Sequence, residues 1–348
     1  FAAAIAVGAG TINDLVKLAA HEAQLPYGVV ATAASMNGYT SAIAAIYSEG
    51  LKRTLPARPP LWVVGDTEVL AAAPPDMTRA GLADLMSKPS STADWRAASW
   101  LLGEYFCPFC ASVADQAETV CRQAAAEIGR CEPEAVELLF AGLLLSGLSM
   151  AMAGSSAPAS GGEHLISHVW DMKSLVAGRH HALHGAQAGV GTLVCAALWQ
   201  LLRELDPPDQ HRIAAIVKSR RPWDEEVVRI RQLLGPQLAG PAVEEYRAKR
   251  PDDAALVLRL SKLSGGWHEF WGELLGILRP VTVLRETLIT ASAPTTAAEL
   301  GFTAEEMREA FAAAKYIRRR YTVHDLATDL GMFDELFEPA LELSGVLR

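Results

Sequence analysis

The sequence predicts a small α/β segment followed by a larger all-helical segment, and the pattern of apolar residues supports this division. Up to about residue 75, short apolar runs alternate with glycine-containing turns and one helical pattern. From Met77 onward the strand signals fade, and windows rich in Ala, Leu and Glu repeat at helical spacing. We therefore expect an α/β domain over residues 1–75 and an all-helical domain over residues 76–348.

The first segment has the order of elements that is typical of a parallel sheet. In chain order we expect a strand at 3–7, a glycine turn at 8–11, a helix to about residue 24, a strand at 27–31, a polar segment at 32–41 and a strand at 61–65. In the second segment, helix-rich windows cover 77–87, 93–128, 133–153, 162–174, 184–204 and several stretches beyond 221, with Pro and Gly clusters between them.

Composition and charge exclude some classes of protein. Of the 348 residues, 50% are hydrophobic and 20% are charged, which is the profile of a soluble globular protein. The net charge of −9 argues against a nucleic-acid surface, so an anionic substrate needs a local basic pocket. The most apolar run, residues 138–152, is shorter than the roughly 20 residues of a membrane span, so we expect a buried core helix.

The N-terminal end has no signal-peptide pattern. The chain begins at Phe1 inside an apolar run without a starting Met, so we expect further residues upstream.

Five cysteines include one CxxC pair, Cys107 and Cys110, which is the form of a redox or zinc pair. Because no second CxxC exists and the pair lies among aromatic and apolar residues, we expect buried free thiols, as in a reducing cytoplasm, and hence a cytoplasmic location.

The glycine turn and a cluster of histidines carry residue types that could serve chemistry. Gly8 to Thr11 lie between a strand and a helix, where a pyrophosphate could bind the helix N-terminus, although a plain turn has the same pattern. Five of the nine histidines fall within residues 162–185. His164 and His168 share one helix face and His184 opens the next helix, an arrangement that suits either a catalytic metal or separate structural roles. We expect His180 and His181 to be solvated.

Asp84 stands in an apolar helical segment, where a lone carboxylate is costly to bury unless it is paired or bound to a metal. From spacing alone, the favoured interpretation is a half-exposed acid that pairs with Lys88 four residues later.

Together these stretches resemble the sn-glycerol-1-phosphate dehydrogenase family, especially its AraM-type bacterial branch, within the iron-containing alcohol dehydrogenase and dehydroquinate synthase superfamily. The matching stretches occur in the family's order at 8–14, 32–41, 83–85, 92–95, 104–109, 160–168, 183–185 and 320–323. The resemblance implies the C-terminal part of a Rossmann-like nucleotide-binding domain followed by a helical metal-binding domain of dehydroquinate synthase-like fold. It also implies that the cysteine motif serves packing.

The resemblance implies a set of site residues as well. Asp84, His164 and His184 would bind one divalent metal, either zinc, nickel or iron. The substrate would contact Asn37, Asp84 and His168, of which Asp84 and His168 would be catalytic. NAD or NADP would contact Gly8, Ala9, Gly10, Thr11, Ile12, Thr32, Ala33, Ala34, Ser35 and Ser41.

Three departures from the family pattern affect these expectations. Asn37 stands where the family usually has an Asp, so substrate preference or rate would differ because a charge and a proton acceptor are lost. Relatives have further residues before the glycine turn, including the acid that binds the adenosine ribose, so this chain is expected to bind the cofactor less well. Residues 80–83 and Pro89 differ from the family's glycine- and aromatic-rich pattern, a tolerable change.

The implied activity is the interconversion of dihydroxyacetone phosphate and sn-glycerol 1-phosphate in a cleft between the two domains. Lys52 and Arg53 are candidates for the substrate phosphate. A homodimer without nucleic acid or membrane span is expected. The alternatives are a superfamily enzyme acting on another polyol phosphate or a cyclitol, including a lyase of the dehydroquinate synthase kind, and a non-catalytic paralogue that assembles with a partner.

Overall fold

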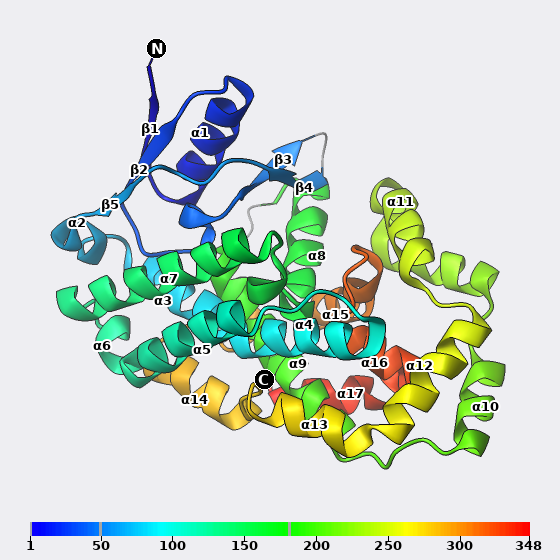
Figure 1. The fold of residues 1–348 in the computed structure, drawn as a ribbon. Coiled ribbons are helices and arrows are strands. Elements are labelled where there is room, and N and C mark those ends of the chain that lie inside the picture. Colours follow the sequence, from blue (N-terminus) through cyan, green and yellow to red (C-terminus); the bar gives the residue numbers. More distant parts are fainter. Residues whose placement is uncertain (1, 49–50, 180–181) are drawn as a thin grey trace.

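A computed structural model describes residues 2–48, 51–179 and 182–348, and of residues 47, 48 and 51–53 it describes the backbone alone. A small α/β part stands at the N-terminal end of a larger body of helices (Figure 1). The fold class predicted from the sequence is thus confirmed. The predicted domain boundary between residues 75 and 76 falls at the first turn of α3 (Pro75–Met86) and remains a prediction.

The α/β part is built on a short parallel sheet of the order β1-β2-β5. Its strands are β1 (Ala4–Gly8), β2 (Tyr27–Ala31) and β5 (Val63–Gly65), close to the predicted ranges. Helix α1 (Gly10–Glu22) connects the first two strands and packs against both. Ala6 and Val29 are completely buried, whereas Ile5 and Val7 on the edge strand β1 are more than half exposed, at 57% and 61%.

An antiparallel hairpin follows the polar segment, and the sequence did not predict it. The hairpin pairs β3 (Ile43–Ser48) with β4 (Leu51–Pro56) in a continuous register from Ile43–Pro56 to Ser48–Leu51. It packs on α1 and reaches α8 (Gly162–Val176) through β4, so it forms one side of the space between the α/β part and the helices. Because the hairpin is held mainly by these tertiary contacts, neither strand has a strong alternating pattern of its own.

Most helices occupy the predicted windows, but α2 and α10 lie outside them, and the window 93–128 is broken both after α4 and between α5 and α6. They are α2 (Thr67–Ala71), α3 (Pro75–Met86), α4 (Lys88–Leu102), α5 (Pro108–Gln123), α6 (Ala125–Gly129), α7 (Pro133–Ala153), α8 (Gly162–Val176), α9 (His184–Arg203), α10 (Gln210–Ser219), α11 (Trp223–Lys249), α12 (Asp253–Gly265), α13 (Trp267–Leu275), α14 (Val281–Thr290), α15 (Ala304–Ala313), α16 (Val323–Asp329) and α17 (Phe333–Ser344). Short 3₁₀ turns lie at Gly38–Thr40, Ala157–Ala159, Ala298–Leu300 and Ala314–Tyr316. The window 93–128 is divided at Gly103, whose φ of 74° ends α4 in the left-handed region that favours glycine.

Helix α9 is the centre of the helical body. Every residue from Gly185 to Trp199 is buried, and the helix packs against α3, α8 and α17. Helices α7 and α9 are long and apolar enough to cross a membrane by length and composition, but 56% and 89% of their apolar windows are buried inside the protein. Both are core helices, and the expectation for residues 138–152 is confirmed.

Asp94 on α4 joins stretches that are far apart in the sequence. Its side chain is completely buried, and Oδ2 accepts a hydrogen bond from Gly162 N at 2.7 Å while Oδ1 accepts one from Val323 N at 2.8 Å. These amides belong to the first turns of α8 and α16, which leave N–H groups without partners in the helix. One carboxylate therefore fixes the start of the histidine-bearing helix α8.

Replacing Gly185 with Ala tests the close approach of α9 to α3. A Cβ at Gly185 would lie 2.0 Å from the backbone oxygen of Ala80, so we expect Gly185→Ala to lower the free energy of unfolding by about 1–3 kcal/mol. Urea denaturation followed by circular dichroism measures this change. Gly272→Ala is the matched control, because no atom lies within 4 Å of that Cβ, and it should be neutral or slightly stabilising. Equal stability of the two variants would contradict the close approach.

Candidate active site

One cavity of about 350 Å³ lies where the N-terminus of α1 faces α8 and the start of α9. Of the predicted site residues, the ones that line it are Ala9, Gly10, Thr11, Ile12, Ser35, Asn37, Ser41, His164, His168 and His184. Residues predicted for cofactor and residues predicted for metal and substrate therefore meet in one space. Gly8, Thr32, Ala33, Ala34 and Asp84 are not part of the lining.

The turn between β1 and α1 forms the side of the cavity for which cofactor binding was predicted. Gly8 has a φ of 155°, and a Cβ there would lie 2.8 Å from Cβ of Ile12, so the backbone turns closely onto α1. No described side chain caps α1, and its first turn contains no acidic residue. The free N–H groups of this turn are of the kind that binds a phosphate group. The carboxylate of Asp14, in the next turn of α1, also lines the cavity and accepts a hydrogen bond from Ala45 N at 2.9 Å.

The residues 32–34 pack beneath the turn and do not face the cavity. Ala33 and Ala34 are buried, and a Cβ at Gly81 of α3 would lie 2.0 Å from the Ala34 oxygen. Thr32 N donates to the Gly8 oxygen at 3.3 Å, which ties this segment to the glycine turn. Their part in the site is to hold the backbone of the turn against α3.

Lys17 is a residue of the site that the sequence analysis missed. Its side chain is completely buried, and its ammonium donates to the oxygens of Gly38 and Ile43 and to Ser41 Oγ, at 2.6, 3.0 and 3.1 Å. Burial lowers the pKa of Lys17 to about 8, with Asp14 opposing this change. Lys17 thus supports the loop that carries Ser41, and nothing in its helical surroundings in the sequence distinguishes it from a surface lysine.

His164 is held between two carboxylates. Glu163 Oε1 accepts hydrogen bonds from His164 Nδ1 at 2.8 Å and from Gly161 N at 2.7 Å. Burial raises the pKa of Glu163, but these hydrogen bonds outweigh it and leave the pKa below its usual range. Because an ionised carboxylate only accepts, Nδ1 carries a proton, and Nε2 faces Asp84 Oδ1 at 3.5 Å.

A chain of side chains fixes the tautomer of His184 in the same way. Gln187 Nε2 donates to Asp171 Oδ1 at 2.9 Å, so Gln187 Oε1 is the acceptor for the Ser167 hydroxyl at 2.9 Å. The Ser167 oxygen then accepts from His184 Nδ1, 3.1 Å away, which leaves the lone pair on Nε2. The rings of His184 and His164 lie 5.1 Å apart, and those of His184 and His168 lie 5.8 Å apart.

Asp84 is fully buried and pairs with Lys88 at 2.8 Å. The pairing expected from the spacing is confirmed, while the expected half-exposure is wrong, because the start of α9 packs over Asp84 and the turn at Ala157–Ala159 packs over Lys88. Lys88 also donates to Ser87 Oγ and to the Ala159 oxygen, both at 3.0 Å, so all three ammonium protons have acceptors. Burial raises the pKa of Asp84, but the Lys88 ammonium and His164 have the larger opposite effect. The pKa of Asp84 therefore lies well below its usual range.

The side chains of Asp84, His164 and His184 are of the types that bind a divalent metal. It offers one ionised carboxylate and two imidazoles whose outer nitrogens are each held by a second residue, as in protein metal sites. Among the described residues, no three His, Cys, Asp or Glu side chains form a preassembled metal cluster. In the structure the Lys88 ammonium supplies the positive charge beside Asp84.

Asn37, for which a substrate contact was predicted, also lines the cavity. Its backbone N donates to Asp84 Oδ2 at 3.1 Å and its side-chain amide to Ser146 Oγ at 3.3 Å. Among the described side chains that line the cavity there is no lysine or arginine. The side chains of Lys52 and Arg53 and both histidines of the pair His180 and His181 lie outside the described residues.

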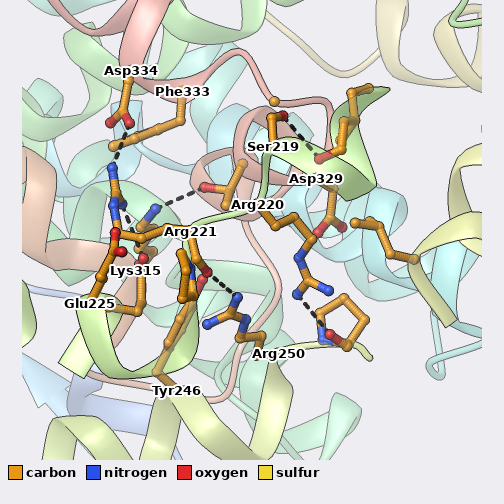
Figure 2. A pocket seen from close by; sticks show the side chains of 17 residues that line it. Ser219, Arg220, Arg221, Glu225, Tyr246, Arg250, Lys315, Asp329, Phe333 and Asp334 are labelled. Carbon is orange, nitrogen blue, oxygen red and sulfur yellow. Dashed lines mark hydrogen bonds and ion pairs between the residues drawn. The ribbon is translucent and has the colours of Figure 1, made fainter. Parts of the chain in front are cut away.

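A second cavity, of about 330 Å³, lies among α10, α11, α16 and α17 and contains none of the predicted site residues (Figure 2). The charged side chains that line this second cavity largely neutralise one another. Arg221 pairs with Glu226 at 3.0 Å and with Asp334 at 2.9 Å. The first cavity, with its helix N-terminus and its oriented imidazoles, is therefore the candidate active site.

Known proteins are similar to this chain in sequence and in fold. The family model described as iron-containing alcohol dehydrogenase matches residues 1–74. A protein named glycerol-1-phosphate dehydrogenase (NAD(P)+) from Halalkalibacterium halodurans is 38% identical over 196 residues, which are 56% of this chain and 49% of that protein. One of the same name from Pyrococcus furiosus is 38% identical over 205 residues, 58% of each chain. This chain thus spans about half the length of the curated relatives it matches.

Solved structures share the fold over nearly the whole chain. A probable glycerol dehydrogenase from Sinorhizobium meliloti superposes with a TM-score of 0.57 at 18% identity, covering 96% of this chain and 77% of that one. The glycerol dehydrogenase from Schizosaccharomyces pombe has the same TM-score and identity, with coverages of 99% and 72%. Residues 1–74 are thus similar to the iron-containing alcohol dehydrogenase family, and the whole chain has the fold of the glycerol dehydrogenases.

Proposed function

We propose that this protein is an NAD(P)-linked, metal-dependent oxidoreductase that interconverts dihydroxyacetone phosphate and sn-glycerol 1-phosphate. The observation that carries the proposal is the single cavity that joins the uncapped N-terminus of α1 to His164, His168 and His184. The relatives are named glycerol-1-phosphate dehydrogenase, which supports this choice of substrate. A cytoplasmic location and a homodimer are part of the same proposal.

Each residue has a distinct task in this proposal. Asp84, His164 and His184 would hold the metal, and the first turn of α1 would bind the dinucleotide phosphates through backbone N–H groups. When bound, a divalent metal supplies positive charge that polarises a substrate oxygen, and a nicotinamide supplies or accepts the hydride. His168, one turn after His164 on α8, would orient a substrate hydroxyl or take part in proton relay.

A second candidate is a superfamily enzyme that acts on another polyol phosphate or on a cyclitol. Two observations favour it, namely the amide of Asn37 in place of a carboxylate and the absence of lysine and arginine among the described lining residues. A phosphate ester would then depend on residues whose side chains are not described, such as Lys52 and Arg53. Comparing turnover of dihydroxyacetone phosphate with that of unphosphorylated dihydroxyacetone and inosose ketones separates the two candidates.

Replacing Asp84 tests the proposed reaction directly. With zinc or nickel, NADH or NADPH and dihydroxyacetone phosphate, we expect Asp84→Asn to lower kcat/KM by more than about a hundredfold, because the charged metal ligand is lost. Absorbance at the nicotinamide band measures the rate. Asp334→Asn, which removes a charge of an exposed ion pair, is the control and should keep the rate. Undiminished turnover in Asp84→Asn would exclude the assigned role.

Replacing Lys88 tests whether a cation must accompany Asp84. Without added metal, Lys88→Met leaves a buried carboxylate unpaired, and we expect the free energy of unfolding to fall by about 3–5 kcal/mol. Added zinc should raise Tm more in this variant than in the unaltered protein. Lys173→Met is the control, because the Lys173–Glu309 pair is partly exposed and should contribute less than about 1 kcal/mol. If both variants lost the same free energy of unfolding and zinc restored neither, Asp84 would not need a cation beside it.

Replacing Ser167 tests the orientation of His184. Ser167→Ala removes the acceptor for His184 Nδ1, so we expect the affinity for zinc, measured by chelator competition, to fall about 10- to 100-fold. Ser112→Ala, which removes only an exposed hydroxyl bonded to the Phe109 oxygen, should leave the affinity unchanged. An unchanged affinity in Ser167→Ala would show that this network does not orient a ligand.

A further inference from the structure

The proposed function makes no use of the CxxC pair at the start of α5. Cys107 is the N-cap of this helix, Pro108 begins it, and Cys110 follows in the first turn. The Cys107 side chain is partly exposed, whereas Cys110 is 1% exposed. The expectation of buried free thiols therefore holds for Cys110 and is wrong for Cys107.

The beginning of α5 favours a thiolate at Cys107 and a thiol at Cys110. The first-turn N–H groups lack partners within the helix and point toward the N-cap side chain. The Cys110 N–H, the Cys110 thiol and the Tyr105 hydroxyl lower the pKa of Cys107. Burial and the neighbouring Cys107 raise the pKa of Cys110 to about 11. The two sulfurs are thus adjacent but have opposite tendencies to ionise.

The surroundings suit attack on a disulfide better than metal binding. In the described part of the chain no third His, Cys, Asp or Glu completes a metal cluster with this pair. Cys107 is partly exposed and lies between Tyr105 and Phe109, which are 66% and 64% exposed, so the pair stands at the protein surface. Residues three apart in a first helical turn lie on one face, a separation that a disulfide can bridge with a small adjustment.

We propose that Cys107 and Cys110 form a reversible dithiol–disulfide pair that reacts with small-molecule or protein disulfides. The Cys107 thiolate attacks one sulfur of the incoming disulfide, whose S–S bond breaks, and the departing thiolate takes a proton from solvent. The Cys110 sulfur then attacks the Cys107 sulfur of the mixed disulfide, loses its proton to solvent and releases the second thiol. The protein dithiol is oxidised by two electrons and the incoming disulfide is reduced to two thiols. This inference does not depend on the proposed dehydrogenase function.

The test is to react the reduced protein with oxidised glutathione and to count the remaining thiols by alkylation and mass spectrometry. Of the five cysteines, two should be lost together as one internal disulfide, so that three remain alkylatable, and dithiothreitol should restore all five. Peptide mapping should place the disulfide between Cys107 and Cys110. Five alkylatable thiols after prolonged exposure, or a disulfide elsewhere, would overturn the proposal.

Two variants separate the roles of the sulfurs. In Cys110→Ala the reaction should stop at a glutathione adduct on Cys107, and in Cys107→Ser oxidation should slow by about tenfold or more. Cys131→Ser is the matched control, since Cys131 is a partly exposed thiol outside the CxxC pair, and it should oxidise like the unaltered protein. If Cys107→Ser oxidises as fast as this control, or if Cys110→Ala gives no adduct, the assignment is wrong.

Discussion

The buried carboxylate of Asp84 is the interaction on which the candidate site depends. One of its oxygens accepts from the backbone of Asn37 in the α/β part, and the other faces Lys88 of α4 and lies near His164 of α8. A charge without solvent is stable only when it is surrounded by donors or cations. The α/β part, the α3–α4 junction and the histidine helix are therefore held in one relative arrangement by the need to neutralise one group.

A second carboxylate organises the other side of the same helix. Asp94 binds the first turns of α8 and α16, and Arg320 donates to the Ser160 oxygen, just before α8 begins. The helix that carries His164 and His168 is consequently fixed at its N-terminus, while the α1 N-terminus opposite it is left open. This asymmetry produces a cavity with a helix N-terminus on one edge and imidazoles on the other in a protein whose net charge is −9.

Much of the fold was predictable because it rests on local patterns. Strands β1 and β2, the glycine turn and helices α3, α7, α8 and α9 follow from runs of apolar residues bounded by Gly and Pro. The β3–β4 hairpin and the break at Gly103 were missed, since the first depends on packing against α1 and the second on a single glycine within an otherwise helical window. Local propensity is a weak guide where tertiary contacts decide.

The sequence by itself determined the residue types of the candidate site, its order along the chain and the i, i+4 pairing of Asp84 with Lys88. Only the tertiary structure decided that this pair is fully buried, that Lys17 supports the loop carrying Ser41, and that Glu163 and Ser167 fix which nitrogen of each histidine carries a proton. The reason is physical: spacing places neighbours on one helix face, whereas burial and hydrogen-bond direction depend on which other segments enclose that face.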